Sequence, residues 1–275
     1  MDEHIELPVI DENDYLKPIQ RLARDIAKAA ATMSADEARF LVDAYYLMQD
    51  DRKRTTNQVR ALGESEEPHA VLVWLAEQSS TLEKQIARAL DTYTQAHTMG
   101  SWMREIVGIG PIISAGLLAH IDIEKAPTVG HIWRFAGLDP TMKWDKGQKR
   151  PWNAKLKVLC WKAGQSFLKF HNNENCYYGH IYAQRKVYEQ TRNDADGNVE
   201  LAKQLLEQKK FGKTTEAYKS LSIGRLPPGQ IDARARRYAV KLFLSHMWEE
   251  WYRRHNKKDP PLPYPIAYLG HTHKI

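Results

Sequence analysis

A short glycine turn followed by an apolar segment sets the tightest limit on how this chain folds. The turn is Ile106-Val107-Gly108-Ile109-Gly110-Pro111, and the apolar run 112–121 follows it directly. Glycine has no Cβ, so two glycines close together allow the backbone to turn sharply. Proline is favoured at the first position of a helix, where its missing N–H would have no partner. The sequence therefore predicts that one helix ends within 102–107 and that another begins at Pro111.

The start of the second helix is a candidate binding site for a phosphate group. Backbone amides at a helix N-terminus have no intrahelical partners and favour an anion. The order apolar–Gly–apolar–Gly, with Ala115 five residues after the second glycine, is typical of a helix-hairpin-helix, whose usual ligand is a nucleic-acid phosphate backbone. A helix–helix connector that only needs glycine is the alternative. The candidate contact residues are Gly108, Ile109, Gly110, Ile112 and Ser114.

The composition limits the classes of protein to which this chain can belong. It has 275 residues and 43% hydrophobic side chains, which favours a packed core over a disordered tail. Lysine and arginine exceed aspartate and glutamate by 40 to 34, and this mild excess does not establish nucleic-acid binding by itself. Two cysteines without a CxxC pair argue against a disulfide scaffold or a cysteine zinc site. With no long apolar run, we expect a cytoplasmic protein with no membrane partner.

Residues 1–100 are predicted to form an acidic arm followed by a helical hairpin. Ser34 and Glu37 have the spacing of a capping box, in which two side chains satisfy amides at a helix start. The helix that begins there is expected to end at a break over 63–68. The next helix, 71–96, carries apolar residues at three- and four-residue spacing, which is typical of a coiled coil. This seam either packs on the preceding helix or joins two copies of the chain as a homodimer.

A basic segment with two tryptophans lies in the predicted helix-hairpin-helix domain, 101–192. Its cations stand against a single acid, Asp145. Cations with interleaved aromatic side chains are typical of surfaces that contact phosphates and stack on unpaired bases, and a solvated loop is the alternative. Asn153 is expected to cap the helix that follows. The candidate contact residues are Lys143, Trp144, Lys146, Lys149, Arg150, Trp152, Asn153, Lys155 and Lys157.

The last third of the chain is predicted to add one long helix. Residues 193–230 are polar and interrupted by glycine and proline, so we expect a surface insertion. Residues 231–275 are expected to form a closing helix and a tail rich in proline and histidine. Four cations on that helix fit a DNA-facing surface and an ordinary solvated face equally well, namely Arg234, Arg236, Arg237 and Lys241. No segment has the two-residue period of a β-strand, so the predicted fold class is all-α.

Histidines and serines support weaker hypotheses for a chemical site. Four histidines are candidate metal ligands, namely His246, His255, His271 and His273. Three serines are candidate nucleophiles, namely Ser114, Ser166 and Ser245. No acidic residue at a suitable spacing accompanies the histidines, and no activating base accompanies the serines. We therefore predict no metal site, leave the catalytic residues unassigned, and expect Mg²⁺ only if the chain has nuclease activity.

Taken in order, these motifs resemble the C-terminal domain of IS110/IS116/IS902-type transposases. In that family a glycine hairpin precedes an A-G-L-x-P segment and a basic helix start with the pattern G-N-x-x-L. This chain has Ala136-Gly137-Leu138-Asp139-Pro140 and then a basic glycine loop that ends at Asn153. Segments 51–62 and 233–237 resemble the linker and the closing A-x-A-x-R helix of the family. The resemblance covers residues 40–255 and implies binding to DNA or structured RNA in a bacterial, phage or mobile-element setting.

Two catalytic elements of that family are not found in this sequence. The family carries an RNase H-like domain with four metal-binding acids, whereas residues 1–50 show no βαβ pattern. The family also has a serine before the basic glycine segment, where this chain has Lys143-Trp144-Asp145-Lys146-Gly147. Without that nucleophile no covalent protein–DNA intermediate forms by that route. We therefore expect a DNA-binding relative of these transposases, in DNA transposition or recombination. The alternatives are an active transposase or recombinase that obtains a metal-binding domain in trans or uses another nucleophile, and a helical protein-binding scaffold.

Overall fold

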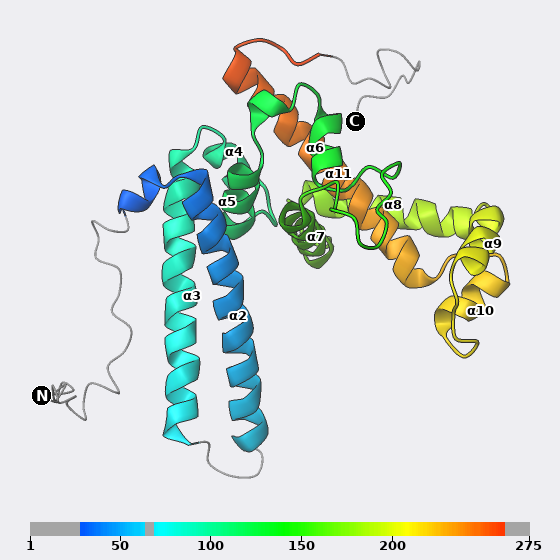
Figure 1. Ribbon diagram of the computed structural model, residues 1–275, viewed down its shortest axis with the longest axis horizontal. Helices are drawn as coiled ribbons and strands as arrows, with labels where there is room; N and C mark the ends of the chain where they lie inside the picture. Colours follow the sequence, from blue (N-terminus) through cyan, green and yellow to red (C-terminus); the bar gives the residue numbers. More distant parts are fainter. Residues whose placement is uncertain (1–27, 64–68, 262–275) are drawn as a thin grey trace, which may run out of the picture. The chain divides into compact units, whose positions relative to one another are not determined.

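Two helical units make up the chain in the computed structural model, which describes residues 28–63 and 69–261 (Figure 1). Over these residues the secondary structure is helical without any β-strand, so the predicted all-α fold class is confirmed. The chain divides into its two units between Ala96 and His97, whereas the predicted boundary lies at residue 100. The predicted acidic arm and the histidine-rich end of the tail lie outside the described residues.

The first unit is a pair of long helices preceded by a short 3-10 turn. Its elements are η2 (Ala30–Thr32), α2 (Ala35–Gly63) and α3 (Ala70–Ala96). The amide of Ser34 donates to Glu37 Oε2 at 2.7 Å, and the amide of Glu37 donates to Ser34 Oγ at 3.3 Å. These reciprocal bonds are the predicted capping box, and they fix the start of α2.

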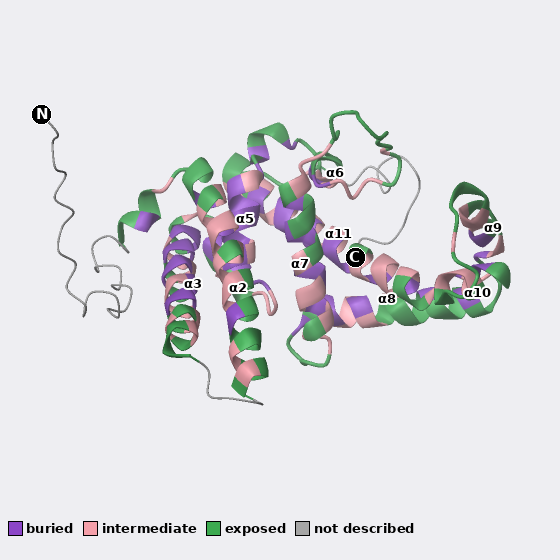
Figure 2. Cartoon of the chain, turned by 60° about the horizontal axis from the view of Figure 1, so that its bottom comes forward, coloured by how far each residue is buried: buried purple, intermediate pink, exposed green. Residues whose placement is uncertain are grey.

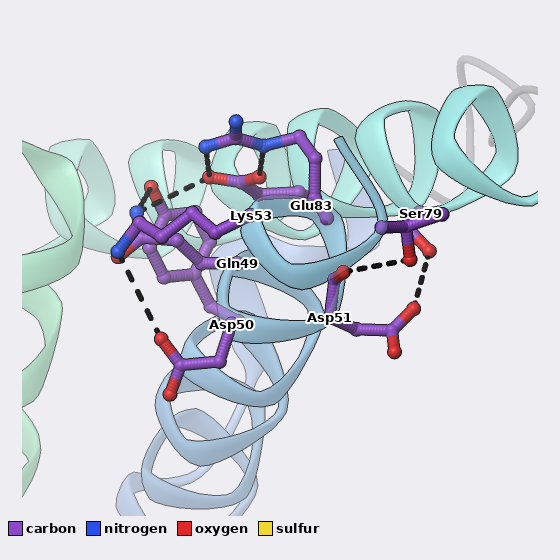
Figure 3. A network of polar contacts seen from close by, with 9 residues as sticks. Gln49, Asp50, Asp51, Lys53, Ser79 and Glu83 are labelled. Atoms are coloured by element: carbon purple, nitrogen blue, oxygen red, sulfur yellow. Dashed lines mark hydrogen bonds and ion pairs between the residues drawn. The ribbon is translucent and has the colours of Figure 1, made fainter. Parts of the chain in front are cut away.

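Buried polar contacts hold α2 and α3 in one register (Figure 3). The carboxylate of Glu83 is largely buried and receives hydrogen bonds from Arg52 and from Gln49 Nε2, the latter at 3.2 Å. Farther toward the connection between the helices, Ser79 Oγ donates to Asp51 Oδ2 at 2.7 Å. A shift of one residue between the helices would leave the Glu83 charge buried and unpaired, which is costly. The network therefore selects one alignment of the two helices.

The apolar seam of α3 is buried over most of its length within a single chain. Gln78, Ile86 and Tyr93 are buried, as the packing alternative expects. Val71 and Leu75, at the start of the helix, remain 56% and 38% exposed. A homodimer through residues 71–96 stays a prediction, and these first two turns hold the large apolar side chains of the seam that are exposed.

The second unit is built around α11, which packs against α6, α7 and α8. Phe243 of α11 is fully buried, and its ring centroid lies 5.6 Å from that of Phe167 on α7 and 5.3 Å from that of Tyr178 on α8. Trp248 Nε1 donates to the Ala126 carbonyl at 2.7 Å, which ties the same helix to the segment before α6. The elements are α4 (Gly100–Glu105), α5 (Pro111–His120), η3 (Ile123–Lys125), α6 (Val129–Phe135), α7 (Ala154–Lys169), α8 (Tyr177–Asp194), α9 (Val199–Gln208), α10 (Glu216–Ser222) and α11 (Pro228–Asn256).

Residues 193–230, expected as a surface insertion, contain α9 and α10 around a small apolar core of their own. Asn193 is buried and ties the two ends of this segment together, because its Oδ1 accepts from the amide of Leu226 at 2.8 Å and its Nδ2 donates to the Leu226 carbonyl at 3.1 Å. These helices were not predicted, because the polar composition of the segment and its glycines and prolines indicated irregular structure, although α9 carries apolar residues at helical spacing. The core residues are Ala202, Leu221, Leu226 and Ile231.

Truncating Arg52 should destabilise the first unit much more than truncating Arg54. Arg52→Ala leaves the Glu83 carboxylate without its cation, and we expect a loss of about 1–2 kcal/mol in the free energy of unfolding, since water reaches part of the pair. Arg54 is 81% exposed where it pairs with Asp51, so Arg54→Ala should cost less than about 0.5 kcal/mol. Urea unfolding followed by helical circular dichroism measures both variants. Equal losses would show that the Arg52–Glu83 contact does not hold the helices together.

The same network should make stability depend on pH. Burial tends to raise the pKa of Glu83, but hydrogen bonds from Arg52, Gln49 and Tyr45 outweigh it and hold the pKa below its usual value. The folded pKa is then lower than the unfolded one of about 4.3, so the stabilisation is present above that pH and is lost as pH falls through the folded pKa. Glu83→Gln should flatten the fall in melting temperature below about pH 5. An unchanged pH profile in Glu83→Gln would contradict this role.

Candidate nucleic-acid interface

The glycine turn joins α4 to α5 as the sequence predicts. Helix α5 begins with Pro111 in its first turn and Gly110 as its N-cap. Gly108 has a φ of +97°, a left-handed conformation that strongly favours glycine. Its carbonyl accepts a hydrogen bond from Ser166 Oγ at 2.6 Å, so the turn is held against the end of α7.

Only part of the predicted amide cluster is available to a ligand. The amide of Ile109 already donates to the Ile106 carbonyl, and the amide of Ser114 donates to the Gly110 carbonyl, each at 3.0 Å. Pro111 has no amide hydrogen. The N–H groups that α5 leaves without an intrahelical acceptor are those of Gly110, Ile112 and Ile113.

Three of the predicted contact side chains belong to the core. Ile109, Ile112 and Ser114 are 2%, 9% and 0% exposed, because they lie on the inner side of the turn and of α5. Their spacing along the chain was predictable, but the direction in which their side chains point was not. Their side chains cannot reach a nucleic acid, and of the three only Ile112 keeps an available amide.

The polar groups of Asn153 have partners within the protein. Its Oδ1 accepts from the amide of Leu156 at 3.0 Å, which confirms the predicted cap of α7. Its own amide donates to the Phe135 carbonyl at 2.8 Å, and its Nδ2 lies 3.3 Å from Nδ1 of His120. Asn153 therefore positions the basic loop and is a poor candidate for direct contact with a ligand.

The two predicted tryptophans have different surroundings. Trp152 packs on Gly137, where a Cβ would lie 2.7 Å from the indole Cγ and where φ is +65°. Trp144 is 41% exposed and is fixed by a bond from Nε1 to the Gln148 carbonyl at 2.6 Å. Trp144 is thus the more accessible ring. Trp152 packs against both Gly137 and Trp144 and so supports the loop.

Two cations lie over these rings, and further cations lie on the same loop and on helices α7 and α11. The loop over 143–150 is exposed between α6 and α7 (Figure 2). Arg150 lies over the Trp144 ring at 4.9 Å, and Lys157 lies over the Trp152 ring at 4.3 Å. We call this surface the basic face, and its cations are Lys143, Lys146, Lys149, Arg150, Lys155, Lys157, Arg237 and Lys241.

Two members of the basic face, Arg237 and Lys241, come from α11. Lys241 lies 3.9 Å above the Trp133 ring of α6, and Trp133 Nε1 donates to the Lys241 carbonyl at 3.2 Å. Lys241 was weighed as a DNA-facing residue from the sequence, whereas Trp133 was not, since only the packing of α6 on α11 brings the two together. Arg237, which was weighed in the same way as Lys241, is exposed and lies close enough to Lys157 and Lys241 to repel both.

The electrostatics of the basic face favour an anion. Burial lowers the pKa of Lys157, and the charges of Arg237 and Arg150 lower it further. Burial also lowers the pKa of Lys241, and Arg237 adds to this while Asp139 opposes it. Cations therefore lie near one another with few carboxylates between them. A bound phosphate would relieve this repulsion.

Arg234 does not join the basic face. Its Nε donates to Glu189 Oε2 at 2.7 Å, and Arg185 binds the other oxygen of the same carboxylate. Glu189 is only 1% exposed, so the two guanidinium groups compensate a buried charge. Arg234 thus has a structural partner, and we leave it out of the candidate interface.

The glycine turn and the basic face lie at opposite ends of α5. Gly108, before α5, contacts Ser166 near the end of α7, whereas His120, at the end of α5, contacts Asn153 at the start of α7. The two helices are therefore antiparallel. A helix of ten residues is about 15 Å long, and this separates the two candidate phosphate sites.

The surroundings of the turn are more acidic than those of the basic face. A pocket of 440 Å³ lies beside Ile106 and Val107. Its lining includes Glu105, Glu249 and Glu250, and Glu250 is paired with Arg253 of the same lining. Carboxylates still outnumber arginine and lysine side chains around this pocket, so the basic face is the stronger of the two candidates.

The histidines and serines that the sequence suggested for chemistry have structural partners or are buried. His246 Nδ1 lies 2.9 Å from the Tyr178 hydroxyl, and His255 Nε2 lies 3.6 Å from Glu124. Ser166 and Ser245 donate to backbone carbonyls. His271 and His273 lie outside the described residues. Across 28–63 and 69–261, no three histidine, cysteine or acidic side chains are grouped so that they could hold a metal ion.

No family model matches this chain, and neither a curated protein nor a solved structure matches it. Within the described part of the chain, every helix is too short or too polar to cross a membrane. The assignment of function therefore depends on the geometry and charge of the basic face and the glycine turn.

The two glycines of the turn should respond differently to substitution. Gly108→Ala forces a Cβ onto a left-handed backbone, 3.2 Å from Ser166 Oγ, and should cost at least about 1–2 kcal/mol of stability. Gly110 has a φ of −82°, no atom lies within 4 Å of its Cβ position, and asparagine is a good N-cap. Gly110→Asn should therefore leave the urea midpoint unchanged or slightly higher. Similar losses for both variants would contradict this geometry.

Proposed function

We propose that this chain binds the phosphate backbone of DNA or structured RNA through the basic face. The observation that carries the proposal is the grouping of cations, with few carboxylates among them, beside exposed and half-buried indole rings. Among the described residues, Lys143, Lys146 and Lys149 form no ion pair. Phosphates are the common polyanions that neutralise such a surface, and counterion release then supplies much of the affinity.

The glycine turn supplies a second, weaker contact in this proposal. Its free amides of Gly110, Ile112 and Ile113 suit one phosphate. The separation of about 15 Å from the basic face equals roughly four base steps at 3.4 Å each along one strand. One nucleic-acid molecule can therefore span both sites. Contacts of this kind position the ligand and do not read its sequence.

The resemblance to IS110-type transposases supports the same function. In this chain the Gly137 of the A-G-L-x-P segment receives the Trp152 indole, and Asn153 caps the basic helix. The packing at Gly137 and the cap at Asn153 explain why the chain needs these residue types in the motifs that carry the resemblance. We propose that the chain acts on DNA in a cytoplasmic transposition or recombination system, as a binding component.

Removing two loop lysines should weaken nucleic-acid binding and its dependence on salt. Lys146→Ala with Lys149→Ala removes two cations from the basic face, so the slope of log affinity against log salt should fall by about 2. The matched control is Lys209→Ala with Lys210→Ala, which removes the same charge from exposed residues after α9. Fluorescence anisotropy with labelled duplex, single-stranded and structured RNA ligands measures both double variants.

The control separates a specific surface from the overall charge of the chain. If the basic face is the interface, the control should keep almost the full affinity and slope of the unmodified chain. Equal losses in the two double variants would mean that net charge alone drives binding. No binding to any of the ligands at low salt would contradict the proposed function and favour a protein-binding scaffold.

A further inference from the structure

A small apolar pocket opens between α7 and α11, next to the basic face. Its volume is 170 Å³. An apolar cavity of about 150 Å³ is large enough to bind benzene, so this pocket has room for one flat aromatic ring system. Burial raises the pKa of the Cys160 thiol to about 12, so this wall residue stays uncharged. The apolar lining consists of Leu138, Cys160, Gly164, Ala233 and Val240.

Three cations border the same pocket. Arg236 has a carboxylate beside it, since its Nε lies 2.7 Å from Asp232 Oδ2. Lys157 and Arg237 form no ion pair with a carboxylate among the described residues. Lys157 also stacks over Trp152, which joins the pocket to the rest of the basic face. The pocket thus combines an apolar interior with a positively charged rim.

Trp161 gives the pocket an open aromatic wall. The indole lines the pocket and is nevertheless 58% exposed. Trp161 follows Lys157 by four residues on α7, so the ring and the cation lie on the same face of the helix. An exposed indole beside cations is the arrangement on which single-stranded nucleic acids stack their bases.

We propose that this pocket holds one unpaired nucleobase of a DNA or RNA strand whose phosphates lie on the basic face. The base stacks on Trp161 and fills the apolar interior, while Lys157 and Arg237 contact the adjacent phosphates. A base within a duplex is stacked between its neighbours and cannot enter without leaving the helix. This inference rests on the proposed function, because a strand must first be held at the basic face.

The test compares a short duplex that carries one bulged nucleotide with the same duplex in which the bulge is abasic. Both have the same phosphates, so they differ only in the base offered to the pocket. We expect the full chain to bind the bulged duplex about 5- to 100-fold more tightly than the abasic one in anisotropy titrations. A DNA pair and an RNA pair, measured side by side, identify which kind of strand supplies the base.

Two variants separate the pocket from the charge around it. Trp161→Ala removes the stacking surface, and Ala233→Leu fills the interior without changing any charge. Both should bring the affinity ratio close to one while keeping the affinity for the abasic duplex. Val158→Ala is the matched control, since Val158 is half exposed on the same helix and does not line the pocket.

The outcomes distinguish this inference from the proposed function. Salt-dependent binding with equal affinity for the bulged and abasic duplexes would overturn the base pocket and leave phosphate binding intact. A ratio that persists in both Trp161→Ala and Ala233→Leu would also overturn it, because the base would then be bound elsewhere. Absence of binding to every duplex would overturn both proposals.

Discussion

The close approach of α7 and α11 at Gly164 determines where the cations of this protein lie. A Cβ at Gly164 would lie 3.1 Å from Val240 Cγ2, so the two helices pack more tightly here than a larger residue would easily allow. This packing places Lys157 of α7 beside Arg237 of α11 and leaves the small pocket next to them. A bulkier residue at Gly164 would push the helices apart and separate the cations.

Repulsion among these cations lowers the stability of the folded state. Other contacts of the same unit offset this loss. Burial lowers the pKa of Lys241, and its ammonium group also lies over the Trp133 ring, where the negative face of the ring partly offsets the cost. The aromatic core of Phe243, Phe167 and Tyr178 supplies packing that does not depend on charge. Functional surfaces often contain residues that lower the stability of the folded state but are needed to bind a ligand. The glycine turn is the weaker site for a phosphate because carboxylates, not cations, predominate beside it.

Local sequence signals predicted the parts of the fold that depend on a few neighbouring residues. The capping box of Ser34 and Glu37, the start of α5 at Pro111 and the cap at Asn153 each involve side chains and amides within one helical turn. The all-α class followed from the period of the apolar residues. In contrast, α9 and α10 were missed, because the polar composition and the glycine and proline breaks of residues 193–230 outweighed the apolar spacing within α9.

The composition of the candidate site required the tertiary structure. Arg234 and Arg237 are three residues apart on one helix, yet one pairs with the buried Glu189 and the other joins the basic face. Their roles depend on which helices pack on either side of α11, and a single sequence does not specify that. The same is true of Trp161, whose spacing suits a core residue as well as an open pocket wall.

Hydrogen–deuterium exchange of the full chain, with and without a single-stranded oligonucleotide at low salt, tests the central claim most directly. If the basic face is the interface, protection should appear in the loop over 143–153, in the first turns of α7 and around Arg237 and Lys241. Helices α9 and α10 should exchange as they do in the free protein. Binding that leaves the loop and α7 unprotected, or that protects α9 and α10 instead, would contradict the account.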